Sequence, residues 1–442
     1  MDSKETNLKK LYLKYLFPSL FSGLVMSIYS LVDMIVVGQY EGSNGTAALA
    51  CIAPFWTFFC CLSVLFGNGG AVLFSIAKGE GNKKDEKNAF TISFVLICVI
   101  TAIVWLIIFL FDAQLLRLFG ADETLMPLAL RYMKWLKLGV PLWPIGYFLA
   151  MFVRNDGSPL LAGAATIAGG VLNVFGDFFL TFTCDLGIEG AGIATVVGQS
   201  IAFLILLTHF ISKKNTVSFT RMTDFWRKSK EITSIGFSSF ICSVSMGFMM
   251  ILFNNQIVAY FGNNELAIYG IAGNIFTLIQ TFSYGIGNAA QPIVAESLGA
   301  KQTDQVKQVR KMGSITAIII GCLVMLITML IPMQIAKLYL GNSEQIIAST
   351  PFILRSYFTC LLFVPFNVFA TYYLQAIRRV KESVCISVLR GFFLSGAFVY
   401  LFPSILGANA IWFAMLGAEM VTMLLAVWMF KIKNFKNGTK SY

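Results

Sequence analysis

Long apolar runs are the feature that most constrains how this chain can fold. Stretches of roughly 20 apolar residues recur from one end of the sequence to the other, and each can cross a bilayer core of ~30 Å. Only 12% of the residues are charged and 57% are hydrophobic, which no water-soluble domain of this length would show. Spanning β-strands would need ~10-residue alternating segments, which the sequence lacks. We therefore expect an all-α integral membrane protein.

Polar breaks divide the chain into twelve predicted transmembrane helices. In order, they cover Tyr12–Val37, Thr46–Ala77, Ala89–Phe111, Leu125–Val153, Pro159–Phe182, Gly190–Ile211, Ile232–Phe261, Leu266–Ala295, Met312–Tyr339, Phe352–Ile377, Ser383–Phe402 and Ala408–Phe430. They are predicted to form two six-helix lobes, an N-terminal one over residues 1–212 and a C-terminal one over residues 232–431. Residues 213–231 would be a basic cytoplasmic linker, and residues 432–442 a cytoplasmic tail.

The distribution of Lys and Arg predicts the orientation. Of the 33 basic residues, 26 lie at one set of helix ends, in the N-terminal tail, residues 78–87, Arg154, residues 213–230, 301–311 and 378–381, and the C-terminal tail. Short loops with such an excess stay in the cytoplasm. We predict a multi-pass protein of a prokaryotic cell membrane with both termini cytoplasmic. The same loops face anionic lipid, so the net charge of +11 does not indicate a nucleic-acid partner.

The two halves of the chain resemble each other. At an offset of 220 residues the matches are Gly42 with Gly262, Asn44 with Asn264, Ala47 with Ala267, Gly67-Asn68 with Gly287-Asn288, Gly79 with Gly299, Lys87 with Lys307, and Leu186-Gly187 with Leu406-Gly407. At an offset of 224, Pro127, Arg131, Pro141 and Arg154 match Pro351, Arg355, Pro365 and Arg378. Both halves begin in the cytoplasm, so they form a parallel repeat, an organisation known from transporters whose lobes rock about a shared cavity.

Enzymatic chemistry finds little support in the sequence. The chain has one histidine, His209, so a metal cluster or a hydrolytic triad would lack its usual base. The nine cysteines lie mostly in apolar spans without metal-ligand or disulfide spacing. We therefore expect neither an enzyme nor a cofactor, and no obligate protein partner is evident.

Four polar side chains in the first half share one depth in the membrane. Asp33 and Asp177 each lie close to the outer end of a span, Asn173 precedes Asp177 by one turn, and Thr195 is five residues inside the next span. A carboxylate pair with amide and hydroxyl oxygens suits Na⁺, or a proton shared between the acids. The alternative is that both aspartates only cap helix ends.

The second half has no such acid pair. At the matching place stand Asn254, Asn255 and Gln256, while Glu419 lies near the middle of the last span. Glu419 could be a buried acid bonded to its neighbours or a charge facing the substrate. Three methionines of one span, Met246, Met249 and Met250, together with Asn254, Gln256 and Glu419, are candidates for a cavity that accepts flat lipophilic cations.

Pro18 lies fifteen residues before Asp33 in the first predicted span. Because proline removes a backbone hydrogen bond, this helix could bend there and couple Asp33 to movement. A fixed kink is the alternative.

At several places the sequence resembles the multidrug and toxic compound extrusion (MATE) family. The matching segments are Tyr29-Ser-Leu-Val-Asp33 with Val37-Gly38, Gly67-Asn68 with Gly79, Arg154-Asn-Asp-Gly157-Ser-Pro159, Asn173 with Asp177, Gly187-Ile-Glu-Gly190-Ala-Gly-Ile-Ala-Thr195, and Gln291-Pro292 with Gly299. They extend across essentially the whole chain.

The resemblance to the DinF-like branch of that family implies a cation site in the N-terminal lobe. It would consist of Tyr29, Asp33, Asn173, Asp177 and Thr195. The implied activity is export of small organic cations in exchange for H⁺ or Na⁺ by alternating access. The sequence departs from the NorM-like branch, because its seventh and tenth spans carry no acid. A second-lobe cation site is therefore expected only if Glu419 supplies its charge.

Two other classes of function are alternatives. A flippase for lipid-linked sugars would need basic residues in its cavity to hold pyrophosphate, and Arg390 is the clearest candidate, followed by Arg131 and Arg355. A membrane-embedded enzyme or a receptor would need a paired nucleophile and base or a signalling domain, and the sequence supplies neither.

Overall fold

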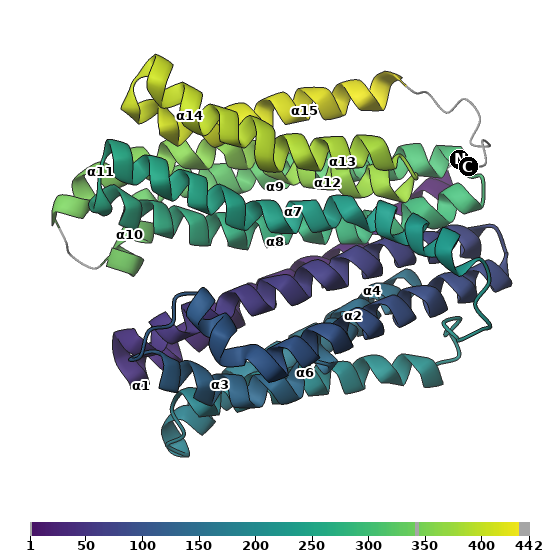
Figure 1. Cartoon of the computed structure of the whole chain (residues 1–442). Helices are drawn as coiled ribbons and strands as arrows, with labels where there is room; N and C mark the ends of the chain where they lie inside the picture. Colours follow the sequence, from purple (N-terminus) through teal and green to yellow (C-terminus); the bar gives the residue numbers. More distant parts are fainter. Residues whose placement is uncertain (1, 341–343, 433–442) are drawn as a thin grey trace. The chain divides into compact units, whose positions relative to one another are not determined.

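The computed structural model describes residues 2–340 and 344–432, and it divides into two compact units (Figure 1). The first unit ends at Phe240 and the second begins at Ile241, so the division falls inside one long helix, α7 (Phe225–Tyr260). The described residues form helices and connecting turns with no β-strand. Most of the predicted C-terminal tail, residues 433–442, lies outside the described part of the chain.

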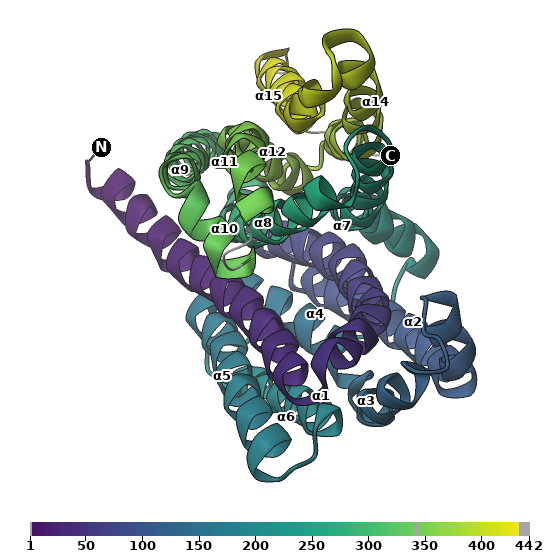
Figure 2. The same cartoon turned by 90° about the vertical axis from the view of Figure 1, so that its left-hand side faces the viewer.

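The first unit contains the helices that precede α7. These are α1 (Asp2–Gly79), α2 (Lys83–Leu118), α3 (Met126–Gly139), α4 (Leu142–Asn155), α5 (Pro159–Phe178), the π-helical η1 (Phe179–Thr183), α6 (Ile188–Leu207) and the short η2 (Thr208–Ile211). In the view of Figure 2, α1 runs beside α5 and α6.

The second unit contains the remaining helices. These are α8 (Asn263–Gly299), α9 (Thr303–Leu330), α10 (Pro332–Leu340), α11 (Glu344–Phe358), η3 (Thr359–Leu362), α12 (Val364–Ala376), α13 (Val380–Val388), the π-helical η4 (Leu389–Phe393), α14 (Leu394–Leu406), η5 (Ala408–Phe413) and α15 (Ala414–Ile432). Aromatic and aliphatic side chains from α7, α8, α11, α12 and α15 form its core.

The described helices account for the twelve predicted spans. Ten helical stretches are long and apolar enough to cross a membrane, and α3 with α4 form an eleventh that is bent by 48°. The longest helix, α1, contains two predicted spans, which meet at a kink at Gly42. The all-α, twelve-span fold class is therefore confirmed.

Two predicted spans are interrupted at a proline, and one predicted span boundary was wrong. The fourth span is not one straight helix, because Pro141 cannot continue the backbone hydrogen bonds of α3 and starts α4. The ninth span ends at Leu330 rather than Tyr339, since Ile331 leaves helical geometry and Pro332 begins the separate helix α10.

The repeat seen in the sequence is also present in the backbone. Gly42 (φ 71°, ψ −156°) and Gly262 (φ 112°, ψ −162°), which are 220 residues apart, interrupt the helical geometry of the backbone. Both have a positive φ, which favours glycine. The same offset relates Phe111 (φ −126°, ψ 23°) to Ile331 (φ −120°, ψ 36°), where each half interrupts a long helix. Both units therefore interrupt their helices at these two corresponding positions.

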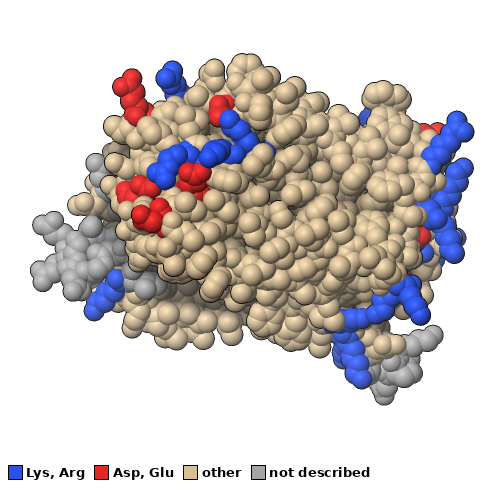
Figure 3. Space-filling view, turned by 90° about the horizontal axis from the view of Figure 1, so that it is seen from below, with Lys and Arg blue, Asp and Glu red and all other residues tan. Residues whose placement is uncertain are grey.

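Charged residues of the first unit gather at opposite ends of its helices. At one end, Lys78 and His209 contact Asp156 at 2.5 and 2.8 Å, and the Thr216 amide donates to the same carboxylate at 2.7 Å. These hydrogen bonds lower the pKa of Asp156 against the opposing effect of its burial. At the other end, Arg131 and Lys134 approach Glu189. On the face shown in Figure 3, the charged side chains lie at two ends and leave an uncharged band between them.

Candidate functional site

Helix α1 brings Tyr29 and Asp33 to the surface of α5. The two residues are one helical turn apart and therefore lie on one face of α1. A Cβ added at Gly170 of α5 would lie only 2.5 Å from the Val25 side chain, so the missing side chain lets α1 approach α5, and the Tyr29 ring lies at an ordinary contact distance of 3.7 Å from the same point. Both Tyr29 and Asp33 are half-buried.

Helices α5 and α6 pack closely because glycines line their contact. A Cβ added at Gly198 would lie 2.6 Å from the Gly169 carbonyl oxygen and 3.1 Å from the Cβ of Asn173. This close approach places Asn173 of α5 against Thr195 of α6, and small residues serve the same purpose at many helix contacts in membranes. Asn173, Asp177 and Thr195 are all buried.

The Asn173 amide links the polar side chains of this site. Its Nδ2 donates to Thr195 Oγ1 at 3.2 Å and lies 3.4 Å from Asp177 Oδ1. Tyr29 interacts electrostatically with both Asp33 and Asp177, and the two aspartates also interact electrostatically with each other. The structure thus brings together Tyr29, Asp33, Asn173, Asp177 and Thr195. We call these five residues the carboxylate cluster.

Three acceptor oxygens of the carboxylate cluster are buried without a hydrogen-bond donor. They are Asp33 Oδ1, Asn173 Oδ1 and Asp177 Oδ2. Among the side chains that the structure describes, no Lys, Arg or His forms an ion pair with Asp33 or Asp177. Buried oxygens are normally paired, and their donor set, two carboxylates with an amide oxygen, fits a small hard cation or a bound proton.

Sequence reasoning missed Tyr132 of α3, which adjoins the carboxylate cluster. Its hydroxyl lies 3.3 Å from Thr195 Oγ1 and also interacts with Asp33. The side chain is almost completely buried. An uncharged tyrosine in an apolar span does not stand out by composition; its depth, six residues into α3, was the one available signal.

The second unit holds a different buried acid. Glu419 of α15 is fully buried, and its Oε1 lies 2.5 Å from Nε of Arg390, which is also buried. The Asn367 amide donates to Glu419 Oε2 at 2.7 Å and to the Glu419 carbonyl oxygen at 2.8 Å. Arg390 lies in the π-helical segment η4, which aims its side chain differently from a regular helix. We call Arg390, Glu419 and Asn367 the charge-paired cluster.

The other candidates for a substrate cavity are distributed over several faces of α7. Met249 packs in the core of the second unit, whereas Met250 is exposed. Met246, Asn254 and Gln256 are half-buried, and the Tyr284 hydroxyl reaches Met246 Sδ at 3.9 Å. Among the described residues of the second unit, no hydrogen bond joins any of these α7 side chains to Glu419. Their role in a cavity stays a prediction.

Pro18 lies inside α1, which keeps helical backbone geometry on both sides of it. The Ser22 hydroxyl donates to the Pro18 carbonyl at 2.5 Å, a bond that serine commonly makes inside helices, whereas the missing amide hydrogen of Pro18 leaves the Lys14 carbonyl without its usual helical donor. A Cβ at Gly163 of α5 would lie 2.8 Å from Pro18 Cβ, so the proline packs tightly there. Bending of α1 at Pro18 stays a prediction.

Comparison with known proteins gives a consistent result. The family model described as MatE matches residues 18–179 and 235–401, one segment in each half. The multidrug export protein MepA of Staphylococcus saprophyticus is 24% identical over 416 residues, which is 93% of this chain and 90% of that protein. MepA of Staphylococcus aureus strain MSSA476 is 25% identical over 425 residues, 95% of this chain and 92% of the relative.

Solved structures share the fold. An outward-facing multidrug resistance MATE family transporter of the MOP superfamily aligns with a TM-score of 0.88 at 22% identity, covering 95% of both chains. A variant of the Vibrio cholerae MATE transporter VcmN aligns with a TM-score of 0.89 at 20% identity, covering 97% of both. At these identities, the likeness concerns the fold.

Proposed function

The chain belongs to the MATE family of multidrug efflux transporters, and from this premise we propose that it exports small organic cations in exchange for H⁺ or Na⁺. The MATE family and its MepA relatives are transporters rather than enzymes. The carboxylate cluster would bind the coupling ion in the first unit. The same residues carry the resemblance to the DinF-like branch, which is part of this proposal.

The observation that carries the proposal is a fully buried Asp177 without a basic partner among the described residues. An isolated carboxylate in an apolar setting is strongly disfavoured, and a second carboxylate nearby adds repulsion. The free energy is lowered when a cation or a proton neutralises the pair. Asp33 is half-buried, so it is the carboxylate that an incoming ion would reach before Asp177.

Export would follow from mutual exclusion. If the coupling ion and the organic cation each favour a different arrangement of α1, ion binding from outside releases the substrate. Loss of the ion on the inside then resets the transporter, which is the alternating-access cycle. A ligand can shift such an equilibrium only by the difference of its affinities for the two states. Pro18 is the proposed bending point of α1.

For Glu419 we propose the role of a buried structural acid. Arg390 neutralises its charge and Asn367 satisfies its second oxygen. A cation would have to displace the guanidinium before it could bind there. The same pairing leaves Arg390 poorly suited to hold pyrophosphate, which argues against the lipid-linked sugar flippase.

Dye efflux in membrane vesicles tests the proposal. We expect export of ethidium when a Na⁺ or H⁺ gradient is imposed, and its loss in Asp33→Asn and Asp177→Asn. Glu123→Gln is the matched control, because this exposed loop acid lies outside the carboxylate cluster. Efflux at the wild-type rate in both aspartate variants would show that coupling lies elsewhere.

The orientation is tested separately by cysteine labelling. Cysteines at Lys83 and Lys228 should react with a membrane-impermeant reagent only from the cytoplasmic side, and a cysteine at Asn44 only from outside. These positions follow from the Lys and Arg count. The reversed labelling pattern would refute cytoplasmic termini.

A further inference from the structure

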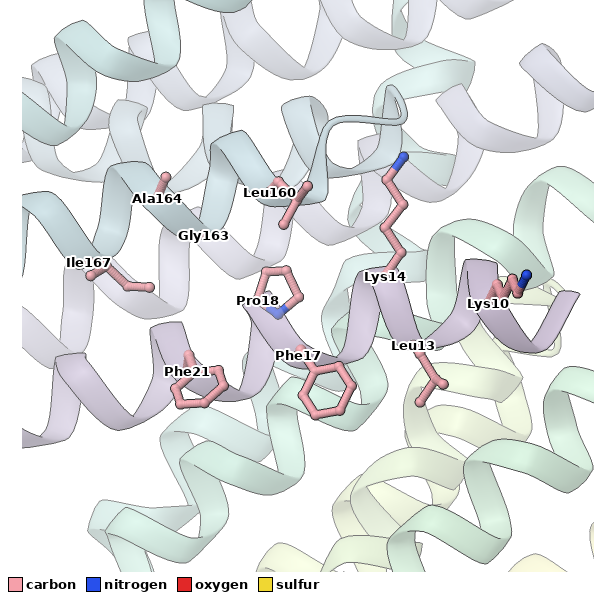
Figure 4. Close-up of a pocket in the computed structure, with 10 residues that line it drawn as sticks. All are labelled: Lys10, Leu13, Lys14, Phe17, Pro18, Phe21, Leu160, Gly163, Ala164 and Ile167. Carbon is pink, nitrogen blue, oxygen red and sulfur yellow. The ribbon is translucent and has the colours of Figure 1, made fainter. Parts of the chain in front are cut away.

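A groove between α1 and α5 of the first unit combines apolar walls with a basic end. It has a volume of about 510 Å³ (Figure 4). Its lining includes Lys10, Lys14, Phe17 and Phe21 of α1, with Leu160 and Ile167 of α5. All of them belong to the first unit.

The groove follows from the spacing of residues on the two helices. Lys10, Lys14, Phe17 and Phe21 recur at helical intervals and lie along one side of α1. On α5, the small residues between Leu160 and Ile167 let α1 approach at Pro18, while the larger side chains stand out on both sides. Phe17, Phe21 and Leu160 are 54%, 55% and 60% exposed, which leaves a large apolar surface open.

The two lysines define the chemistry of one end. In Figure 4, Lys10 and Lys14 lie at the same end of the groove, and both are exposed. Neither forms an ion pair with another described residue of the chain. Two unneutralised ammonium groups attract an anion and repel the cations that the transporter is proposed to export. The groove is thus matched to an amphiphile with an anionic head.

The length of the groove matches one leaflet of a bilayer. From Lys10 to Phe21, α1 advances about 16 Å at 1.5 Å per residue. Half of a bilayer core is ~15 Å thick. A head bound at the lysines would therefore place its apolar chain along Phe17 and Phe21 without leaving its own leaflet.

We propose that this groove is a binding site for one anionic phospholipid. The phosphate lies between the ammonium groups of Lys10 and Lys14, and one acyl chain packs between the aromatic rings of α1 and the side chains of Leu160 and Ile167. This site goes beyond the proposed export function, because it shares no residue with the carboxylate cluster. Its test needs no transport measurement.

The test measures lipid selectivity of the full chain in phosphatidylcholine vesicles. Spin-labelled phosphatidylglycerol and spin-labelled phosphatidylcholine are compared by the fraction that the protein immobilises. The wild type should prefer phosphatidylglycerol, and Lys10→Gln with Lys14→Gln should abolish the preference. The expected loss is about 5-fold per lysine, since ~1 kcal/mol per basic residue near the surface corresponds to that factor.

Two further variants distinguish the groove from general surface charge. Lys213→Gln with Lys214→Gln removes two exposed lysines outside the groove and should keep the preference. Ala164→Trp should fill the groove from α5 and displace the phosphatidylglycerol label while both lysines remain, because Ala164 is an exposed lining residue. A wild type without preference, an unchanged preference in the Lys10 and Lys14 variant, or an equal loss in the Lys213 and Lys214 variant would overturn the proposal.

Discussion

Asp177 in the first unit and Glu419 in the second are both fully buried carboxylates on apolar helices, but their partners differ. Glu419 contacts the guanidinium of Arg390 at 2.5 Å, whereas the charged group that acts on Asp177 is another acid, Asp33. A paired acid needs no further cation, and an unpaired acid does. Burial alone therefore does not identify a coupling site, whereas the sign of the neighbouring charge does.

Neutralising either unpaired acid should have a larger effect on transport than any other change considered. Asp177→Asn and Asp33→Asn should each reduce gradient-driven dye efflux to the background rate, because each removes a charge that the coupling ion must balance. Both proteins should fold, since the amide removes an unfavourable buried charge. Efflux and the yield of monodisperse protein are measured together, with Glu123→Gln as control. Normal efflux in either variant would contradict the prediction.

The second prediction concerns stability of the charge-paired cluster. Glu419→Gln should lower the free energy of unfolding by ~3–5 kcal/mol, because Arg390 is left as an uncompensated buried charge. The double variant Arg390→Met with Glu419→Met should recover most of that stability, since both charges are then absent. Thermal unfolding of the purified protein measures the difference. Asp177→Asn should show no comparable loss, and a loss of equal size there would remove the distinction between the two clusters.

Sequence reasoning could predict the carboxylate cluster because the thickness of a bilayer is fixed, so the depth of a residue can be counted from the end of its span. Counting residues from the ends of the spans placed Asp33, Asn173, Asp177 and Thr195 at one depth, and the resemblance to the MATE family added Tyr29. The repeat likewise predicted two matching halves, and the breaks at Gly42 and Gly262 recur at its offset of 220 residues.

The features that sequence reasoning missed depend on packing between helices. The pairing of Arg390 with Glu419 is set by the π-helical turn of η4 and by the register of α15 against it. Neither the π-helical turn nor this register can be predicted by counting residues from the end of a span. Tyr132 is uncharged, so its contact with Thr195 left no signal in the composition of α3. The break before Pro332 was overlooked because apolar residues continue on both sides of it.

The third prediction sharpens the choice between the coupling ions. Thr195→Ala removes a hydroxyl that accepts a hydrogen bond from Asn173 and would ligate Na⁺. Under a Na⁺ gradient we expect efflux to fall roughly tenfold, and under a pH gradient only about twofold, because a bound proton needs the hydroxyl for orientation alone. Efflux rates under the two gradients are compared in the same vesicle preparation. Equal losses under both gradients would argue against a direct ligand role for Thr195.

The last and smallest expected effect concerns Tyr132, which borders the carboxylate cluster from α3. Tyr132→Phe keeps the buried ring and removes only the hydroxyl that lies 3.3 Å from Thr195 Oγ1. The net value of one such hydrogen bond is ~0.5–1.5 kcal/mol, so efflux should fall between about twofold and tenfold. Tyr357→Phe is a matched control in the second unit, since this buried tyrosine belongs to the apolar core there. If Tyr132 positions Thr195 and Asp33, its removal should raise the ion concentration needed for half-maximal efflux more than it lowers the maximal rate. A change in the maximal rate alone, or an equal change in the Tyr357 variant, would mean that Tyr132 stabilises the fold and does not position the cluster.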